Sequence, residues 1–295
     1  MKLVILGAAG MLGHQIWLKS LEKFGPQNTF GTLRKPKSHY DRFGIFKTGQ
    51  ILDNLDVTDF EQTQKALETI RPDVVINCIG LTLRKPDLAD LEKCIDINSM
   101  LPHRLVLWGA KNSARVIHFS TDCVFNGKRG NYSETDIPTA EDLYGKSKFL
   151  GEIQGKNALT LRLSIVGREL EGKTELVEWF LSQKDQSVKG FSSVRYSGIT
   201  TNVVAKEVIK IITDYPDLAG VYQLASEPIT KFEILELLND KFNVGAQIQE
   251  SGEYTSDKTL DSSRFTEATG FVPPKWSSMI AELAQASDAK YESRP

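Results

Sequence analysis

The feature that most constrains the fold is a glycine-rich turn close to the N-terminus. A short apolar run over residues 2–6 leads into three glycines, Gly7, Gly10 and Gly13, and a helical pattern of apolar residues follows them. Strand, glycine turn and helix in this order form the context that a dinucleotide site requires. The first glycine permits the tight turn, the second lets the backbone approach a pyrophosphate, and the third lets the helix pack close to the strand. The helix N-terminus would offer free N–H groups to the phosphates.

Strand and helix patterns then alternate through the first half of the chain. Further strands are expected at residues 29–33, 51–57, 74–79, 116–119 and 159–163. The run over 74–79 is continuously apolar, which is typical of a central parallel strand covered on both faces. The alternation predicts an α/β fold with a doubly wound parallel sheet of the Rossmann type.

The pattern changes after residue 165, where we expect a smaller C-terminal α/β substrate lobe. The predicted dinucleotide-binding domain covers residues 1–165 plus about 195–225. The predicted substrate-binding lobe covers residues 166–194 and 226–295.

Two helices carry specific expectations. Thr58 is expected to cap a helix that runs to about residue 70, with Glu61 as its capping-box partner. A long helix is expected over residues 87–111, and Asn98 lies in its middle although asparagine is a poor helix former. Asn98 is either simply exposed or a polar link to the neighbouring strand.

The loop after the second expected strand bears on the cofactor. At this place an acidic residue holds the ribose 2′-hydroxyl of NADH, whereas an arginine accommodates the 2′-phosphate of NADPH. The loop has Arg34, Lys35 and Lys37 and no acid. It therefore favours NADPH, with NADH possible, and the alternative interpretation is a solvated basic loop.

Composition limits the partners. The net charge of the 295 residues is −2, which gives no case for a nucleic acid or an acidic membrane. No apolar run reaches the roughly 18–20 residues that span a bilayer. The three cysteines lack metal-ligand spacing, so we expect reduced thiols and no metal site. The first strand begins at Lys2 and leaves no room for a signal peptide, so we expect a cytoplasmic protein.

The candidate catalytic groups lie in two adjoining segments. The apolar strand over 116–119 ends in Ser120 and Thr121, and an expected helix opens with Tyr144 and Lys148 on one face. A phenol has a pKa of about 10 and a nearby ammonium lowers it, so Lys148 is expected to tune Tyr144 while also binding a nicotinamide ribose. Tyr144 would protonate a carbonyl oxygen as hydride reaches the carbon, and Thr121 or Ser120 would hydrogen-bond the same oxygen.

The same Tyr-x-x-x-Lys spacing occurs a second time, at Tyr254 and Lys258. Spacing alone is therefore a weak signal, and context separates the two pairs. Tyr254 lies in a polar, turn-rich stretch far from the glycine motif, so we expect no acid–base role for it.

A family resemblance rests on several of these motifs together. They are Gly7-x-x-Gly10-x-x-Gly13, Asp56-Val57, Ser120-Thr121-Asp122-Cys123-Val124-Phe125 and Tyr144-Gly145-Lys146-Ser147-Lys148. The chain resembles the extended short-chain dehydrogenase/reductases, and within them it is most similar to the dTDP-4-dehydrorhamnose reductase family. The resemblance covers most of the chain. It implies a catalytic triad of Thr121, Tyr144 and Lys148, a nucleotide-sugar in the C-terminal lobe, and a 6-deoxyhexose product for a surface polysaccharide.

The resemblance and the fold together supply candidate binding residues. The cofactor set is Gly7, Gly10, Met11, Leu12, Gly13, Arg34, Asp56, Val57, Cys78, Ile79, Gly80, Asn98, Ser120, Tyr144 and Lys148. The substrate set is Thr82, Asp122, Cys123, Val124, Ile165 and Lys258. Relatives form dimers, so a homodimer is a further expectation.

The chain departs from the family pattern on the substrate side. Cys123 replaces a tyrosine, and Ile165 lies where the family has an aromatic residue. A different 4-keto sugar is therefore a plausible substrate. Two other functions stay open: an epimerase or dehydratase of the same superfamily, although Asp122-Cys123 lacks the Asp-Glu pair typical of the dehydratases, and a regulatory subunit similar to the β subunit of methionine adenosyltransferase.

Overall fold

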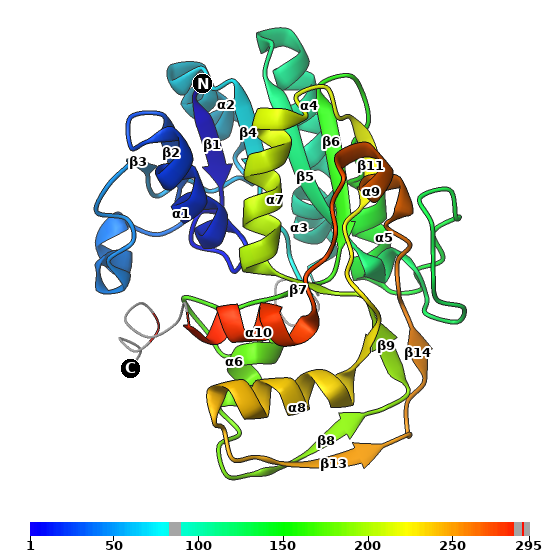
Figure 1. Ribbon diagram of the computed structural model, residues 1–295. Helices are drawn as coiled ribbons and strands as arrows, with labels where there is room; N and C mark the ends of the chain where they lie inside the picture. The colour runs from blue at the N-terminus through cyan, green and yellow to red at the C-terminus, as the bar shows by residue number, and fades with distance from the viewer. Residues whose placement is uncertain (83–89, 286–290, 292–295) are drawn as a thin grey trace.

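The core of the molecule is a seven-stranded sheet, seen in a computed structural model that describes residues 1–82, 90–285 and 291 (Figure 1). Its strands run in the order β11-β6-β5-β4-β1-β2-β3, and each neighbouring pair is parallel. Their bounds are β1 Leu3–Leu6, β2 Thr29–Thr32, β3 Gln50–Leu52, β4 Val74–Asn77, β5 Arg115–Thr121, β6 Ala158–Leu163 and β11 Gly220–Gln223. The strand order reverses between β1 and β4, so the prediction of a doubly wound parallel sheet is confirmed.

Helices cover both faces of this sheet because alternate strand residues point to opposite sides. Leu3 and Ile5 of β1 join one buried cluster with α1 (Gly13–Phe24) and α7 (Thr201–Asp214), which lie in front of the sheet in Figure 1. Val4 of β1 joins a second buried cluster with α2 (Phe60–Ile70) and α4 (Leu101–Asn112). The carboxyl ends of the strands are left open for a site.

The remaining elements gather mostly below those carboxyl ends, as Figure 1 shows. The strands form three small sheets, β10-β7, β12-β9-β14 and β13-β8. Their bounds are β7 Ile165–Val166, β8 Ser187–Phe191, β9 Val194–Tyr196, β10 Ile199–Thr200, β12 Ile229–Thr230, β13 Gln247–Ser251 and β14 Ser256–Asp257. The helices are α6 Leu176–Leu181, α8 Lys231–Phe242, α9 Ser263–Thr269 and α10 Trp276–Gln285. Short helical turns occur at η1 Lys37–Phe43 and η4 Asp122–Val124.

The predicted cap of the second helix is wrong by one residue. Asp59 is the N-cap of α2, and its carboxylate accepts a hydrogen bond from Gln62 N at 3.1 Å. Thr58 is instead held in a turn by Asp56, whose carboxylate accepts from both the backbone N and the hydroxyl of Thr58. The preceding strand also ends at Leu52 rather than at residue 57.

The predicted long helix is present but not uniform. The described part runs through α3 (Leu91–Ile95), a π-helical segment η3 (Asp96–Met100) and α4, while its expected first residues, 87–89, lie outside the described residues. Asn98 lies in the π-helical segment and is fully buried. It accepts a hydrogen bond from Leu81 N at 2.8 Å and donates one to Leu81 O at 3.1 Å. Asn98 is therefore a buried polar link, but it joins the segment after β4 (Val74–Asn77) rather than the strand itself.

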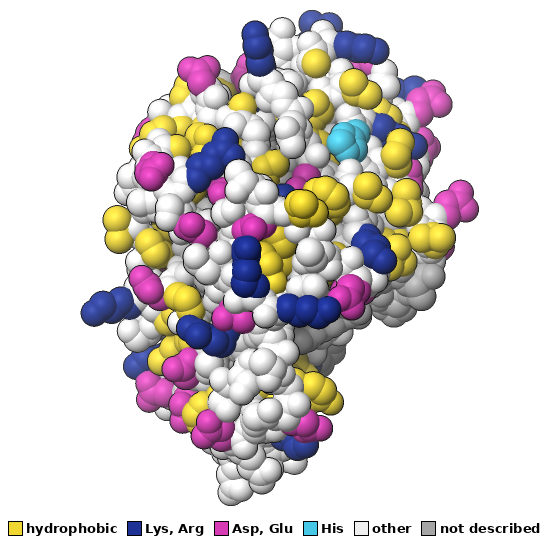
Figure 2. All heavy atoms as spheres, turned by 90° about the vertical axis from the view of Figure 1, so that its right-hand side faces the viewer, with side chains coloured by type: hydrophobic (Ala, Val, Ile, Leu, Met, Phe, Trp, Pro, Cys, Tyr) yellow, Lys and Arg dark blue, Asp and Glu magenta, His cyan; other side chains and the backbone are white. Residues whose placement is uncertain are grey.

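The surface carries charges of both signs. On the face drawn in Figure 2, Lys and Arg side chains are interspersed with Asp and Glu and with apolar groups. Within residues 1–82, 90–285 and 291, no helix has the length and apolar character needed to cross a membrane.

Candidate active site

A cavity of about 500 Å³ opens at the carboxyl ends of the central strands. The glycine turn and the strand ends form one side of it, and segments from below the sheet form the other. Its lining residues are Ala9–Leu12, Asn77–Thr82, Phe119–Cys123, Tyr144, Lys148, Leu163–Gly167, Glu169–Glu171, Glu175, Leu176, Tyr196 and Lys231. This is the place at which open α/β sheets bind their ligands.

The glycine turn closes tightly enough to require glycine. Gly7 has φ of +77°, and a Cβ on Gly13 would lie 2.1 Å from Gly7 O. Gly10 lines the cavity with Met11 and Leu12. Gly7 and Gly13 do not line it but contact each other closely within the turn. The two outer glycines therefore determine how close helix α1 starts to the cavity.

Thr121 and Tyr144 come together from two elements. Thr121 ends β5, and Tyr144 is the second residue of α5 (Leu143–Leu150), whose N-cap Asp142 accepts from Gly145 N at 2.8 Å. The Thr121 hydroxyl donates to Asp122 Oδ1 at 3.1 Å and accepts from Cys123 N at 3.1 Å, and it lies near enough to the Tyr144 phenol to affect its pKa. Burial raises the pKa of Tyr144, the Cys123 thiol raises it further, and the neighbouring Thr121 hydroxyl opposes the rise. The phenol therefore keeps its proton at neutral pH.

The expected lowering of that pKa by Lys148 is wrong for the protein without a cofactor. The Lys148 ammonium donates instead to Phe119 O at 2.7 Å, and it lies 3.3 Å from His118 Nε2. Burial lowers the pKa of Lys148 to about 8, against the opposing effects of Glu152 and Cys94. Lys148 nevertheless lines the same cavity as Tyr144.

Helix α5 is anchored by the buried Asn98. Its amide donates to Ser147 Oγ at 3.1 Å, and that hydroxyl donates to Tyr144 O at 2.9 Å. A Cβ on Gly151, just past the helix, would lie 1.9 Å from Asn98 O. Asn98 does not line the cavity, so in this structure it positions the helix that carries Tyr144 and the segment that carries Leu81.

The substrate-side predictions divide between the cavity and its edge. Thr82, Asp122, Cys123 and Ile165 line the cavity. Burial raises the pKa of the Cys123 thiol to about 12. Burial lowers the pKa of Lys258, but the nearby Cys123 and Asp122 raise it overall. Lys258 therefore lies beside the cavity wall rather than on it.

The second tyrosine of the repeated motif lies elsewhere. The Tyr254 residue is 58% exposed, and its ring packs edge-on against Phe191 with 5.1 Å between the centroids. Only the lysine of this second motif approaches the candidate site.

Several predicted binding residues are not on the cavity wall. The side chain of Val124 is fully buried in a core cluster, and its carbonyl accepts from Thr139 N and Ala140 N. Val57 is likewise in a buried cluster. Arg34 and Asp56 form a largely exposed ion pair at 4.0 Å.

Sequence reasoning missed the wall contributed from below the sheet. The Lys231 ammonium lies 3.8 Å from the centroid of the Tyr196 ring, and both residues line the cavity. Tyr196 is buried, and its hydroxyl has no hydrogen-bond partner among the residues that the structure describes. Glu175 accepts from Thr82 Oγ1 at 3.1 Å across the cavity. No local sequence motif marks these residues. Only the residues just after β6 could have been expected at the cavity, because ligands of open α/β sheets bind at the carboxyl ends of the strands.

Metal ligation finds no support in the described part of the chain. No group of three or more His, Cys, Asp or Glu side chains there is arranged to hold a metal ion. None of the three cysteines, all of which lie in the described residues, forms a disulfide.

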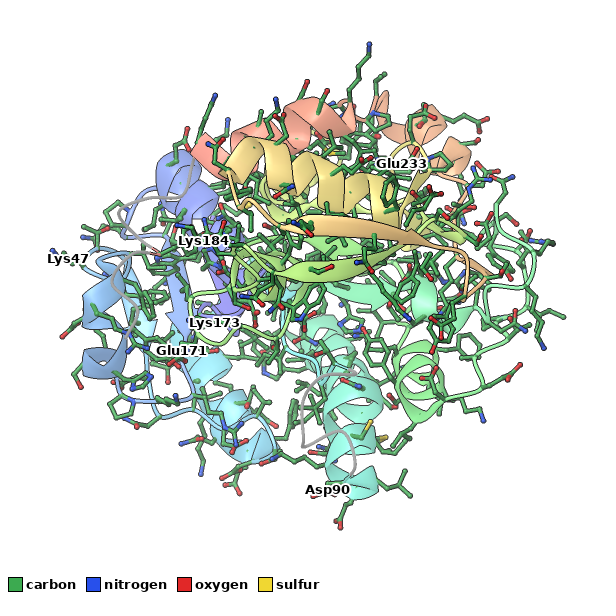
Figure 3. All side chains as sticks on the ribbon, turned by 90° about the horizontal axis from the view of Figure 1, so that it is seen from below. Lys47, Asp90, Glu171, Lys173, Lys184 and Glu233 are labelled. Atoms are coloured by element: carbon green, nitrogen blue, oxygen red, sulfur yellow. The ribbon has the colours of Figure 1, made fainter. Side chains whose placement is uncertain are left out.

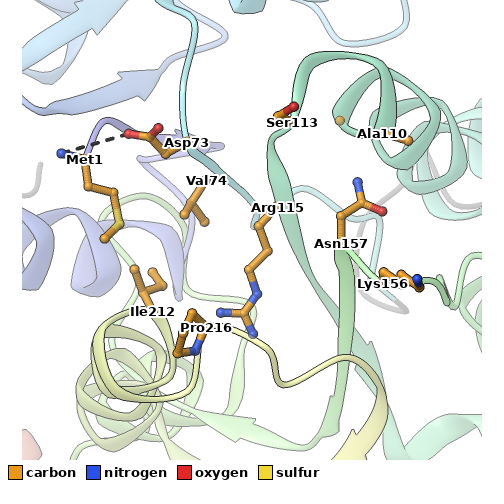
Figure 4. Close-up of a pocket in the computed structure, with 11 residues that line it drawn as sticks. Met1, Asp73, Val74, Ala110, Ser113, Arg115, Lys156, Asn157, Ile212 and Pro216 are labelled. Atoms are coloured by element: carbon orange, nitrogen blue, oxygen red, sulfur yellow. Dashed lines mark ion pairs between the residues drawn. The ribbon is translucent and has the colours of Figure 1, made fainter.

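A smaller hollow of about 340 Å³ lies near the opposite end of the sheet (Figure 4). Arg115 lines it, but its guanidinium donates to Ile211 O and Leu218 O. Asp73 in the same hollow is paired with the N-terminal amine at 3.9 Å. Arg115 and Asp73 thus make structural contacts. The candidate catalytic residues line the cavity of about 500 Å³ instead.

The geometry agrees with a comparison against known families. The profile of one family, described as the RmlD substrate binding domain, matches residues 1–288. The chain belongs to this family. The RmlD family therefore accounts for both the sheet and the segments below it.

Relatives of this RmlD-family chain have different named roles. It is 25% identical to the spore coat polysaccharide biosynthesis protein SpsK of Bacillus subtilis, over 96% of this chain and 97% of that protein. It is 24% identical to the dTDP-4-dehydrorhamnose reductase of Aggregatibacter actinomycetemcomitans, over 96% and 98%. It is also 24% identical to the methionine adenosyltransferase 2 subunit beta of Xenopus tropicalis, over 82% and 72%.

A solved structure shows the same fold. The dTDP-4-dehydrorhamnose reductase of Bacillus anthracis, in complex with NADP, superimposes with a TM-score of 0.78 at 19% identity. The match covers 97% of this chain and 99% of that one.

Proposed function

We propose that this protein uses NADPH, with NADH possible, to reduce the 4-keto group of a nucleotide-linked 6-deoxyhexose, dTDP-4-dehydrorhamnose or a related sugar. The observation that carries the proposal is that Thr121, Tyr144 and Lys148 line one cavity together with Gly10 of the glycine turn. These positions support a proton donor beside a bound dinucleotide.

The proposed roles of the residues follow from their protonation. When bound, the cofactor supplies a hydride to the carbonyl carbon. Tyr144 gives its proton to the carbonyl oxygen, so that the C=O group becomes CH–OH. Its raised pKa suits this direction, because the phenol is fully protonated before reaction and the developing alkoxide is a stronger base. Thr121 holds the oxygen by a second hydrogen bond, and the Lys148 cation orients the nicotinamide ribose.

The proposed substrate lies against the wall below the sheet. Lys231 and Lys258 supply positive charge for a pyrophosphate, and the Tyr196 hydroxyl, which has no partner within the described part of the chain, suits a sugar or base hydroxyl. Cys123 and Ile165 leave room where the family has aromatic side chains. The proposed dinucleotide-binding domain comprises residues 1–165 plus about 195–225. The proposed substrate lobe comprises residues 166–194 and 226–295. A role in surface polysaccharide synthesis is supported by the relative SpsK.

The test is a substrate panel. NADPH oxidation is followed with dTDP- and UDP-linked 4-keto sugars, and the product is identified as the corresponding 4-hydroxy sugar. We expect turnover with at least one of them. Absence of turnover with every sugar, from folded protein that binds NADPH, would reject the proposal.

A second candidate is a non-catalytic regulatory subunit, favoured by the likeness to the methionine adenosyltransferase subunits. In that case the protein binds cofactor, reduces no sugar and elutes with a partner enzyme. The sugar panel and a co-purification from the native host separate the two functions.

A further inference from the structure

Glu171 is the centre of a basic cluster at one end of the cavity. Its Oε1 accepts from Lys35 Nζ at 3.3 Å, from Arg42 Nη2 at 3.4 Å and from His39 Nε2. The three donors come from the loop after β2 and from η1, whereas Glu171 comes from the segment that follows β7. One carboxylate thus joins two parts of the chain that are far apart in sequence (Figure 3).

The cluster lies where the fold places the ribose of a dinucleotide. Lys35 follows the end of β2 by three residues, and in this fold that loop discriminates between a 2′-hydroxyl and a 2′-phosphate. Glu171 lines the same cavity as Gly10 of the glycine turn. A carboxylate of the protein therefore already pairs with basic side chains in the loop where this fold discriminates the two cofactors.

The segment that carries Glu171 is closed into a turn by hydrogen bonds to its neighbour Glu169. The buried carboxylate of Glu169 accepts from Thr174 N at 3.0 Å and from Glu175 N at 2.8 Å. The Glu171 side chain remains 31% exposed. Burial acts to raise its pKa, but His39 and Lys35 hold that pKa below its ordinary value, so Glu171 is an anion at neutral pH.

We propose that Glu171 is a specificity residue that competes with the 2′-phosphate of NADPH for Lys35, His39 and Arg42. The carboxylate and the phosphate are both anions, so they repel each other and compete for the same cationic side chains, and a 2′-phosphate that binds there displaces the Glu171 carboxylate. A ligand with only a 2′-hydroxyl leaves the carboxylate in place. Glu171 therefore weakens NADPH binding and not NADH binding. The inference rests on the proposed dinucleotide-binding function.

Two adenine nucleotides isolate this interaction. 2′,5′-ADP carries the 2′-phosphate and 5′-AMP lacks it, and neither reaches the catalytic residues. Their dissociation constants are measured by calorimetry for the wild type and for Glu171→Gln, and NADPH and NADH are measured in the same way. Because a partly exposed ion pair is worth little, we expect 2′,5′-ADP and NADPH to bind about three- to tenfold more tightly to Glu171→Gln, and 5′-AMP and NADH to be unchanged.

Matched variants control for charge and for the donors. Glu253→Gln removes one charge from another ion pair, the one with Lys189 at 2.9 Å, and should change none of the four affinities. Lys35→Met should weaken 2′,5′-ADP selectively. In the double variant, the gain from Glu171→Gln should shrink because one contested donor is gone.

The competing outcomes are distinct. Unchanged or weaker 2′,5′-ADP binding in Glu171→Gln overturns the inference. Weaker NADH and 5′-AMP binding with unchanged 2′,5′-ADP overturns it too, since Glu171 would then hold a 2′-hydroxyl. A selective gain in 2′,5′-ADP affinity in a protein that reduces no sugar supports the inference and rejects only the proposed reductase function.

Discussion

The imidazole Nε2 of His118, on β5, lies 3.3 Å from the ammonium nitrogen of Lys148, on α5, and both side chains are buried. The hydrogen-bond network assigns the tautomer of this histidine. Asn77 Oδ1 accepts from Ile79 N, so Asn77 Nδ2 donates to His118 Nδ1 at 3.2 Å. A neutral imidazole then carries its proton on Nε2, facing Lys148. Burial lowers the pKa of Lys148, against Glu152 and Cys94, and burial together with the charge of Lys148 lowers the pKa of His118.

The first prediction concerns pH. The pKa of Lys148 is lowered to about 8 by burial, so its cation is present below that pH and is lost above it. We expect kcat/KM for sugar reduction to fall as pH rises through about 8, whereas an ordinary lysine would keep its charge to about pH 10. The measurement is a pH profile of kcat/KM between pH 6 and 10.

Two variants check the assignment. His118→Gln places an amide oxygen within reach of Lys148 and should move the alkaline limb upward by about one pH unit. Glu152 and Cys94, which also face Lys148, remain in place in this variant. Lys148→Arg should abolish the limb within the measured range, because arginine does not deprotonate there. An unchanged limb in Lys148→Arg would show that another group titrates.

The second prediction tests the proton donor. Tyr144→Phe removes only the phenolic oxygen, and it should lower kcat about 10²- to 10⁴-fold, the usual contribution of a general acid. NADPH affinity should change little, because Lys148 and the glycine turn are untouched. Tyr254→Phe is the matched control from the repeated motif and should keep full activity. Equal losses in the two variants would contradict the assignment.

The third prediction concerns the buried asparagine. Asn98→Leu has a similar volume but leaves the N–H and C=O groups of Leu81 without partners. We expect a loss of about 2–4 kcal/mol in the free energy of unfolding, because each buried unpaired group costs about 1–3 kcal/mol. Urea denaturation followed by circular dichroism measures this loss. Asn112→Ala breaks a partly buried helix-end bond from the exposed Asn112 to Trp108 O and should cost about 1 kcal/mol, less than the loss in Asn98→Leu.

The fourth prediction concerns a buried ion pair beside the site. Glu152 accepts two hydrogen bonds from Arg162, at 2.7 and 2.8 Å, and each side chain is 4% exposed. Ser120 Oγ donates to the same carboxylate at 2.7 Å. Glu152→Gln leaves a buried guanidinium uncompensated and should cost about 3–5 kcal/mol of unfolding free energy.

The paired replacement is the sharper measurement. In Glu152→Met/Arg162→Met both charges are gone, and two apolar side chains of similar length fill their space. The double variant should be more stable than Glu152→Gln alone, because removing both members of a buried pair is often nearly neutral. A double variant as unstable as the sum of the single ones would indicate that packing, not charge, explains the loss.

Part of the candidate cofactor site could be predicted from the sequence because the residues that mark it are close together in the chain. Gly7, Gly10 and Gly13 act through backbone conformation and close approach, which residue type and spacing determine within seven positions. Tyr144 and Lys148 are four residues apart on one short helix. Where two local signals compete, sequence reasoning failed: Thr58 and Asp59 are both good helix caps, and Asp56 decides between them by holding Thr58 in a turn.

The sequence by itself determined the doubly wound sheet and its glycine turn, because strand periodicity and glycine spacing are properties of short segments. Tertiary structure alone decided the rest of the site. Tyr196, Lys231 and Glu171 reach the cavity only after segments remote in sequence have packed below the sheet. Folding also decided the protonation of the site: the pKa of Tyr144 is raised and that of Lys148 lowered because burial removes water from charged groups, and burial depends on neighbours from the whole chain.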